Sequence, residues 1–259
     1  MEFLRPPSDP FANVTCKWKV ADNEDVYNKV KGTVPYGPDD ITYVHNSDGY
    51  RCDEFDDWTK HPYRILFAGC SLTEGVGLPL EHTWAKILHG YICDITKTDI
   101  PFWSIARGAT GLDQMVRYMA HYMDRLRPQI VISYLPNLER RERYYNDFFG
   151  PWSMDQYDNL QTKMLFDERF VTYSTEKNVV MMELILEKYK SIMLCSAVDH
   201  KFDLSYIYLN NIKQCIKHVP KVDSARDGLH AGPKTNQMFA DMMFEHFQDI
   251  IKQRLTATK

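Results

Sequence analysis

Residues 63–79 form the stretch YRILFAGCSLTEGVGLP, in which an apolar run stops abruptly at the turn Gly69-Cys70-Ser71. A short apolar run that ends in a glycine turn predicts a buried strand. Such a strand can expose a hydroxyl nucleophile at the edge of a sheet. Taken alone, a serine after a strand is more often the cap of a helix. The assignment of Ser71 therefore depends on what the rest of the chain supplies.

The chain beyond Arg64 alternates apolar runs with amphipathic segments, which is the pattern of βα units on a parallel sheet. Each apolar run is followed by a polar or glycine-bearing turn, as expected where a strand ends. We therefore expect an α/β fold. The predicted strands are 64–68, 102–106, 129–135, 191–197 and a short one at 218–222, and the predicted helices are 82–92, 112–126, 175–189, 204–218 and 233–254.

Residues 1–60 differ from this pattern because they are polar, aromatic and rich in turn-forming prolines and glycines. We expect an irregular N-terminal extension that packs on a domain formed by residues 61–259, with room for a short hairpin. Within it, NSDGYR at 46–51 predicts a turn that returns an aromatic and an arginine side chain to a neighbouring surface. A plain connecting turn is the alternative.

Residues 139–176 interrupt the alternation with a long, aromatic-rich insertion. Connections of this length commonly form a lid or a binding wall, and a buried aromatic cluster is an equally physical alternative. The insertion opens with mixed charges that favour a solvated helix face: Glu139, Arg140, Arg141, Glu142 and Arg143.

Composition and charge narrow the classes of function. The 259 residues are 44% hydrophobic and 25% charged, as in ordinary globular domains, and the formal net charge is −4. A negative chain without a basic stripe does not attract phosphate backbones, so nucleic acid is not an expected partner.

The six cysteines contain no C-x-x-C pair, which favours reduced thiols over a zinc knuckle or a disulfide framework. The histidines form no spaced ligand cluster, so neither a metal nor another cofactor is expected. The first residues, MEFLRPPSDPF, lack the apolar stretch of a signal peptide, and no segment reaches the ~18 apolar residues of a membrane span. We expect a cytoplasmic protein or one that is released without a signal peptide. The sequence predicts no oligomeric state.

Polar or glycine-bearing turns follow the carboxyl ends of the expected strands. A parallel sheet binds its ligands at this edge. The turns are GCSLT at 69–73, RGATG at 107–111, PN at 136–137 and, beyond the last strand, DGLH at 227–230. Together they contain a hydroxyl nucleophile, amide groups for an oxyanion, and a histidine with a carboxylate. At this spacing Asp227 can reach Nδ1 of His230 and leave Nε2 free to take a proton from Ser71.

These residues resemble the SGNH or GDSL hydrolase family over about residues 64–255. The resemblance lies, in the family's order, in Gly69-Cys-Ser-Leu-Thr-Glu-Gly75, Gly108, Asn137 and Asp227-Gly-Leu-His230, with further support from Thr83-Trp84 and from DGLHAGP at 227–233. It implies a three-layer α/β/α sandwich with a five-stranded parallel sheet of the flavodoxin-like type. It also implies ester hydrolysis without a metal.

The same resemblance assigns roles to five residues. Ser71 would be the nucleophile, His230 the base and Asp227 the carboxylate that orients it. Ser71 and Gly108 would donate backbone N–H groups to the oxyanion hole, and Asn137 would donate its side-chain amide.

The chain departs from the family pattern in three places. Cys70 stands where the family has an aspartate that braces the turn, and Leu135-Pro136-Asn137 replaces the usual third block. In the second family block, which contains Gly108, Ser104 occupies the place of the family's leading asparagine. Ala109 or Gly111 therefore remains an alternative to Gly108 as the second oxyanion donor.

The sequence therefore predicts a serine hydrolase that removes short O-acyl groups, above all O-acetyl groups, from a small-molecule or glycan ester. Aromatic residues suit the apolar faces of sugars, which favours a carbohydrate. The alternatives are an O-acyltransferase with the same site and a non-catalytic glycan-binding or structural module. The run at residues 226–236 also resembles the corresponding run in bacterial-virus and marine microbial proteins. Association with a virion is therefore an alternative location.

Overall fold

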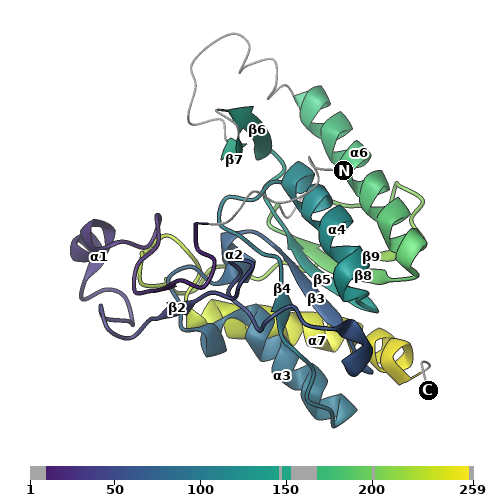
Figure 1. Cartoon of the computed structure of the whole chain (residues 1–259). Coiled ribbons are helices and arrows are strands. Elements are labelled where there is room, and N and C mark those ends of the chain that lie inside the picture. The colour runs from purple at the N-terminus through teal and green to yellow at the C-terminus, as the bar shows by residue number, and fades with distance from the viewer. Residues whose placement is uncertain (1–9, 146–147, 153–167, 200–201, 257–259) are drawn as a thin grey trace.

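The computed structural model describes residues 10–145, 148–152, 168–199 and 202–256, and at the centre of this part of the chain lies a five-stranded parallel sheet (Figure 1). Its strands are, in spatial order, β4 (Trp103–Ser104), β3 (Ile65–Gly69), β5 (Ile130–Leu135), β8 (Ile192–Ala197) and β9 (Ile212–Gln214). Every neighbouring pair is parallel. In chain order this is the flavodoxin-like arrangement 2-1-3-4-5. The predicted α/β fold with a five-stranded parallel sheet is confirmed.

Two helical layers cover the sheet because its strands are apolar on both faces. Ile65 and Phe67 pack in one core cluster with α3 (Trp84–Thr96) and α7 (Pro233–Thr256). Leu66 and Ala68, which alternate with them, pack in the other cluster with α4 (Leu112–Leu126) and α6 (Glu168–Tyr189). Figure 1 shows α3 and α7 together on one side of the sheet and α4 and α6 on the other. The domain is a three-layer α/β/α sandwich.

The prediction was wrong between residues 204 and 222. The expected helix at 204–218 is not formed, and the last strand is β9 instead of 218–222. The N–H groups of Asn210 and Asn211 each donate to the Glu183 carboxylate of α6 at 2.8 Å, so they do not enter a helix. Ile212 then pairs with Met193 of β8. The apolar spacing of residues 204–222 suits either a helix or a strand. Pairing with the open edge of β8 produced a strand, β9.

The N-terminal arm, residues 10–60, is more ordered than expected. β1 (Thr15–Cys16) pairs antiparallel with β2 (Tyr43–Val44), and α1 (Glu24–Val30) lies between them, so the pair is not a hairpin. After the short 3₁₀ helix η2 (Trp58–Lys60) the chain enters the sheet. The preceding residues line the edge of β4, where Asp53 N donates to Phe102 O at 3.1 Å and Trp103 Nε1 donates to Glu54 O at 3.1 Å.

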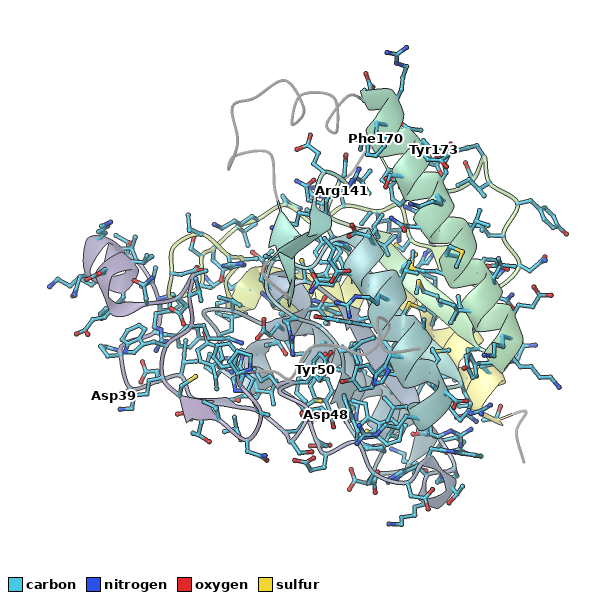
Figure 2. All side chains as sticks on the ribbon, turned by 45° about the horizontal axis from the view of Figure 1, so that its top comes forward. Asp39, Asp48, Tyr50, Arg141, Phe170 and Tyr173 are labelled. Atoms are coloured by element: carbon cyan, nitrogen blue, oxygen red, sulfur yellow. The ribbon has the colours of Figure 1, made fainter. Side chains whose placement is uncertain are left out.

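The insertion begins with an antiparallel hairpin of β6 (Arg141–Tyr145) and β7 (Phe148–Trp152). The expected solvated helix face is therefore wrong. Arg141, at the base of the hairpin (Figure 2), is buried, and the Glu142 carboxylate pairs with the Arg117 guanidinium of α4, with Nε to Oε2 at 2.9 Å. Burial raises the pKa of Glu142 more than Arg117 lowers it. Residues 153–167 of the insertion lie outside the described residues, so the choice between a lid and a buried aromatic cluster stays a prediction.

Two short elements complete the described chain, α2 (Ser71–Glu74) directly after β3 and the 3₁₀ helix η3 (Leu80–His82) before α3. No helix in the described ranges combines the length and the hydropathy that a membrane crossing needs.

Candidate active site

Ser71 begins α2 at the carboxyl end of β3, the strand next to the point where the order of the parallel sheet reverses. Its side chain is 7% exposed. Gly69 allows the tight turn before it, because a Cβ atom there would lie 2.2 Å from Thr73 Oγ1. Thr73 and Glu74 both donate their N–H groups to Cys70 O, at 2.9 and 3.0 Å, which starts the helix at the serine. The turn thus directs Ser71 toward the edge of the sheet.

Ser71, His230 and Asp227 form one hydrogen-bonded chain. Ser71 Oγ lies 2.8 Å from His230 Nε2. His230 Nδ1 contacts the carboxylate of Asp227, whose Oδ1 also accepts the N–H groups of Leu229 at 3.0 Å and His230 at 2.9 Å. With Nδ1 protonated toward the carboxylate, Nε2 presents its lone pair to the serine hydroxyl. The structure brings together the three residues that the sequence analysis selected as nucleophile, base and orienting carboxylate.

The Asp227 carboxylate is held in its charged form. Burial alone would raise its pKa, but the hydrogen bonds and the attraction from His230, together with the backbone N–H groups, outweigh burial and lower the pKa below its usual value. Asp227 therefore remains an anion near neutral pH and can stabilise a positive charge on His230.

Two of the expected oxyanion donors have N–H groups available. Among the described residues, no acceptor pairs with the N–H of Ser71 or of Gly108, and Gly108 is half-buried at the end of the loop after β4. The alternatives fit less well: Gly111 is packed against the backbone of the insertion, where a Cβ atom would lie 2.5 Å from Arg140 O, and Ala109 is exposed with φ 61°.

Asn137, the third expected donor, lies exposed just after β5. Its Oδ1 accepts the N–H of Glu139 at 2.9 Å. Since the oxygen is occupied, the side-chain nitrogen keeps both protons for another acceptor.

Arg51 braces the end of α2 and the residues just after it. Its guanidinium donates to Gly75 O and Leu78 O, both at 2.8 Å, and to Glu74 O at 3.3 Å, and the side chain is buried. The predicted turn at 46–51 is confirmed, because it returns both Tyr50 and Arg51 to the interior. Figure 2 shows Tyr50 within the crowded region between the arm and α4. What sequence reasoning missed is that this arginine holds the nucleophile turn.

Cys70 itself packs in the core, as expected, and is buried. Burial and, to a smaller extent, Cys70 raise the pKa of Tyr134 to about 12.

A buried carboxylate lies close to Gly108. Glu74 is buried, and its Oε2 would be 3.5 Å from a Cβ atom on Gly108. Lys19 of the N-terminal arm pairs with the other carboxylate oxygen and lies 3.2 Å from His45 Nε2. This ammonium offsets a negative charge that would oppose an oxyanion at Gly108. Nothing in the sequence pattern connected Lys19 with the site.

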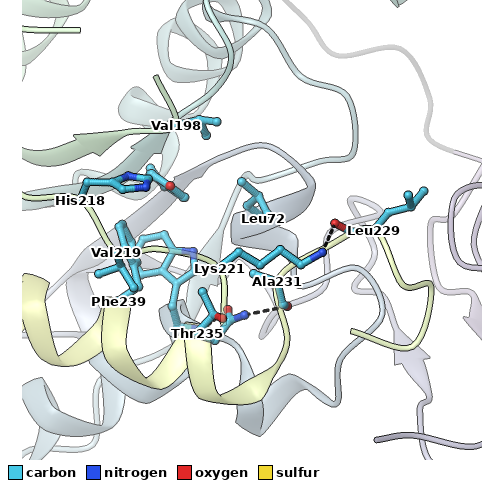
Figure 3. A pocket seen from close by; sticks show the side chains of 12 residues that line it. Leu72, Val198, His218, Val219, Lys221, Leu229, Ala231, Thr235 and Phe239 are labelled. Carbon is cyan, nitrogen blue, oxygen red and sulfur yellow. Dashed lines mark hydrogen bonds between the residues drawn. The ribbon is translucent and has the colours of Figure 1, made fainter. Parts of the chain in front are cut away.

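An apolar pocket of about 270 Å³ is lined by residues that neighbour Ser71 and His230 in sequence (Figure 3). It takes Leu72 from beside Ser71 and both Leu229 and Ala231 from beside His230. Lys221 crosses it and donates from Nζ to Leu229 O at 2.9 Å. The remaining apolar lining consists of Trp84, Tyr134, Val198, Val219 and Phe239.

Val198 also lines a second, open cavity of about 820 Å³ that begins at Asn137. Carboxylates are common in its lining: Glu139, Glu168, Asp199 and Asp203. Within the described ranges, no three histidine, cysteine or acidic side chains are arranged to hold a metal ion.

No protein-family model matches the chain, and a search of curated proteins found no match. Solved structures with a similar course of the chain include TesA, at 11% identity and a TM-score of 0.46, covering 72% of this chain and 99% of TesA. The psychrotrophic esterase EstA from Pseudoalteromonas sp. has 12% identity and a TM-score of 0.47, covering 73% and 98%. The acetyl xylan esterase AlAXEase has 14% identity and a TM-score of 0.34, covering 74% and 80%. At identities and TM-scores this low, the likenesses assign no activity to this chain.

Proposed function

We propose that the protein is a serine ester hydrolase of the SGNH type. The observation that carries the proposal is the chain of hydrogen bonds from Ser71 through His230 to the buried carboxylate of Asp227. A serine, a histidine with its Nε2 facing the hydroxyl and an anion behind Nδ1 are the groups that acyl transfer requires. The N–H groups of Ser71 and Gly108, which pair with no acceptor among the described residues, support an oxyanion hole.

The proposed reaction begins when His230 Nε2 takes the hydroxyl proton and Ser71 Oγ attacks the ester carbonyl carbon. The N–H groups of Ser71 and Gly108 and the amide of Asn137 bind the oxyanion. When the intermediate collapses, the bond to the alcohol oxygen breaks and His230 returns the proton to that oxygen. A water molecule that His230 deprotonates then attacks the acyl carbon. The bond from that carbon to Ser71 Oγ breaks, His230 returns the proton to Ser71 Oγ, and the acid leaves.

The two cavities support an ester of a short acyl chain with a hydroxyl-rich alcohol, such as an O-acylated sugar. The apolar pocket beside Leu72 has room for more than a methyl group, since an engineered cavity of about 150 Å³ accommodates benzene. The carboxylates of the open cavity can accept hydrogen bonds from sugar hydroxyls.

Replacing the nucleophile tests the proposal. In Ser71→Ala, turnover of an aryl acetate should fall by at least about a thousandfold, because the covalent step is lost. The variant should keep the wild-type circular dichroism spectrum. A fluorophosphonate probe should label the wild type at Ser71 and leave the variant unlabelled. An unchanged rate in Ser71→Ala would end the hypothesis, and a probe that never reacts would favour a binding module.

Hydrolysis and transfer are separated by the fate of the acyl group. With an O-acetylated sugar as donor, free acetate should be the product in the presence of excess sugar hydroxyl. Acetylated acceptor in excess over acetate would indicate a transferase that uses the same residues.

A further inference from the structure

Arg226, the residue before Asp227, is held by an aspartate of the N-terminal arm. Its Nε lies 3.0 Å from Asp22 Oδ1 and its Nη2 lies 2.6 Å from Asp22 Oδ2. Both side chains are 0% exposed. A buried guanidinium with a two-point contact to a carboxylate has a defined orientation, because the planar fork matches the two oxygens.

The Arg226 side chain makes further contacts with the arm. Its guanidinium donates to Lys17 O and, at 3.2 Å, to Pro38 O, and it lies 4.1 Å from the centre of the Trp18 ring. The arm thus surrounds the side chain that precedes the proposed catalytic carboxylate, although 204 positions separate Asp22 from Arg226 in sequence.

A second route leads from Asp22 to the nucleophile segment. Tyr43 donates its hydroxyl proton to Asp22 Oδ2 at 2.5 Å, and its oxygen accepts the N–H of Gly77 at 2.8 Å. Gly77 O in turn accepts the N–H of Arg226 at 2.9 Å. Gly77, with φ 79°, permits this approach, because a Cβ atom there would lie 2.8 Å from Ala225 Cβ.

We infer that Asp22 is a positioning residue of the active site, holding the Ser71 segment and the Asp227–His230 loop in register from the arm. The inference rests on the proposed serine hydrolase function. Asp22 touches no reacting group and acts through Arg226 and Tyr43. Its carboxylate joins the two segments that must keep Ser71 Oγ within hydrogen-bond reach of His230.

Asp22→Asn tests the inference because it keeps the size of the side chain and removes its charge and one acceptor oxygen. A misplacement of about 1 Å can cost about 100-fold in rate, so we expect kcat to fall by about 100-fold with KM within about twofold. The matched control is Asp39→Asn. Asp39 belongs to the same arm and also pairs with a cation, Lys17, but both side chains are largely exposed, and Asp39 lies on the outer surface (Figure 2). This control should keep wild-type kcat.

Titration with a fluorophosphonate separates positioning from folding, because it measures the fraction of sites that react and the rate at which each site reacts. Positioning predicts that Asp22→Asn is labelled to the wild-type extent but at a rate reduced in proportion to kcat. A reduced labelled fraction with a wild-type rate per site would show a purely structural role and overturn the inference. A wild type that is never labelled would instead contradict the proposed function itself.

Tyr43→Phe is a second variant for the case in which Asp22→Asn does not fold. It removes only the hydroxyl between Asp22 and Gly77 and leaves the ion pair with Arg226 intact. We expect kcat per labelled site to fall by at least about fivefold, the effect of one net hydrogen bond, because the hydroxyl makes two. An unchanged rate per site in a folded Tyr43→Phe variant would overturn the route through Gly77, and with it the role of Asp22 in joining the two segments.

Discussion

At the residue scale, the site depends on the hydrogen bonds that the local backbone donates to the Asp227 carboxylate. Asp227 Oδ1 accepts two N–H groups of its own turn, and the second oxygen contacts His230 Nδ1. This arrangement follows from a three-residue spacing and is therefore visible in the sequence. The brace that Arg51 provides is different, because Arg51 comes from a separate segment of the chain and binds the backbone that follows Ser71.

The lowered pKa of Asp227 predicts a pH dependence of stability. Because the folded-state pKa lies below the reference value of 3.8, the charged carboxylate stabilises the fold above that pH, and this contribution is lost as the pH falls through the folded pKa. As the pH falls below about 4, the melting temperature of the wild type should fall more steeply than that of Asp227→Asn. Parallel curves would contradict the charge interaction. At neutral pH the same variant should lose about 10⁴-fold in kcat, because the imidazole loses the partner that sets its tautomer.

At the element scale, α2 is only four residues long and cannot hold its own position. The Arg51 guanidinium binds three carbonyl groups in and just after it, and Gly75 closes it with φ 78°. The sheet strands β3, β5 and β8 and helices α4 and α7 were predictable because their apolar patterns match one element type. Residues 204–222 were not, since their spacing suited both a helix and a strand.

Arg51→Lys tests the brace. Lysine keeps the charge but not the planar fork, so at least one buried carbonyl loses its donor, and unfolding free energy should fall by about 2 kcal/mol. The urea midpoint measures this change. Arg127→Lys, at a partly exposed arginine paired with Asp124, is the control and should change stability by less than about 0.5 kcal/mol. Equal effects in the two variants would argue against a specific brace.

At the scale of the whole molecule, the N-terminal arm and the sheet share buried interactions. The ion pair of Asp22 and Arg226 is inaccessible to solvent, and residues 53–54 cover the edge of β4. Separating the arm would leave buried charges and an open strand edge. We therefore expect the arm and the sheet to unfold as one cooperative unit.

Equilibrium unfolding in urea checks this cooperativity. Trp18 reports on the arm, and far-ultraviolet circular dichroism reports mainly on the helices of the sandwich. The difference in fluorescence between wild type and Trp18→Phe should change at the same urea concentration as the ellipticity. An earlier fluorescence transition would show that the arm unfolds by itself.

The sequence by itself determined the order of βα units and the residue types at the strand ends, because hydrophobic period and turn chemistry act over a few residues. It also determined the contact between Asp227 and His230, which lies within one turn. Only the tertiary structure decided that Ser71 Oγ meets His230 across 159 positions and that Arg51 and Asp22 support the two segments concerned. Such contacts depend on how distant segments pack, and the local pattern of an arginine or an aspartate is the same whether it faces solvent or a buried partner.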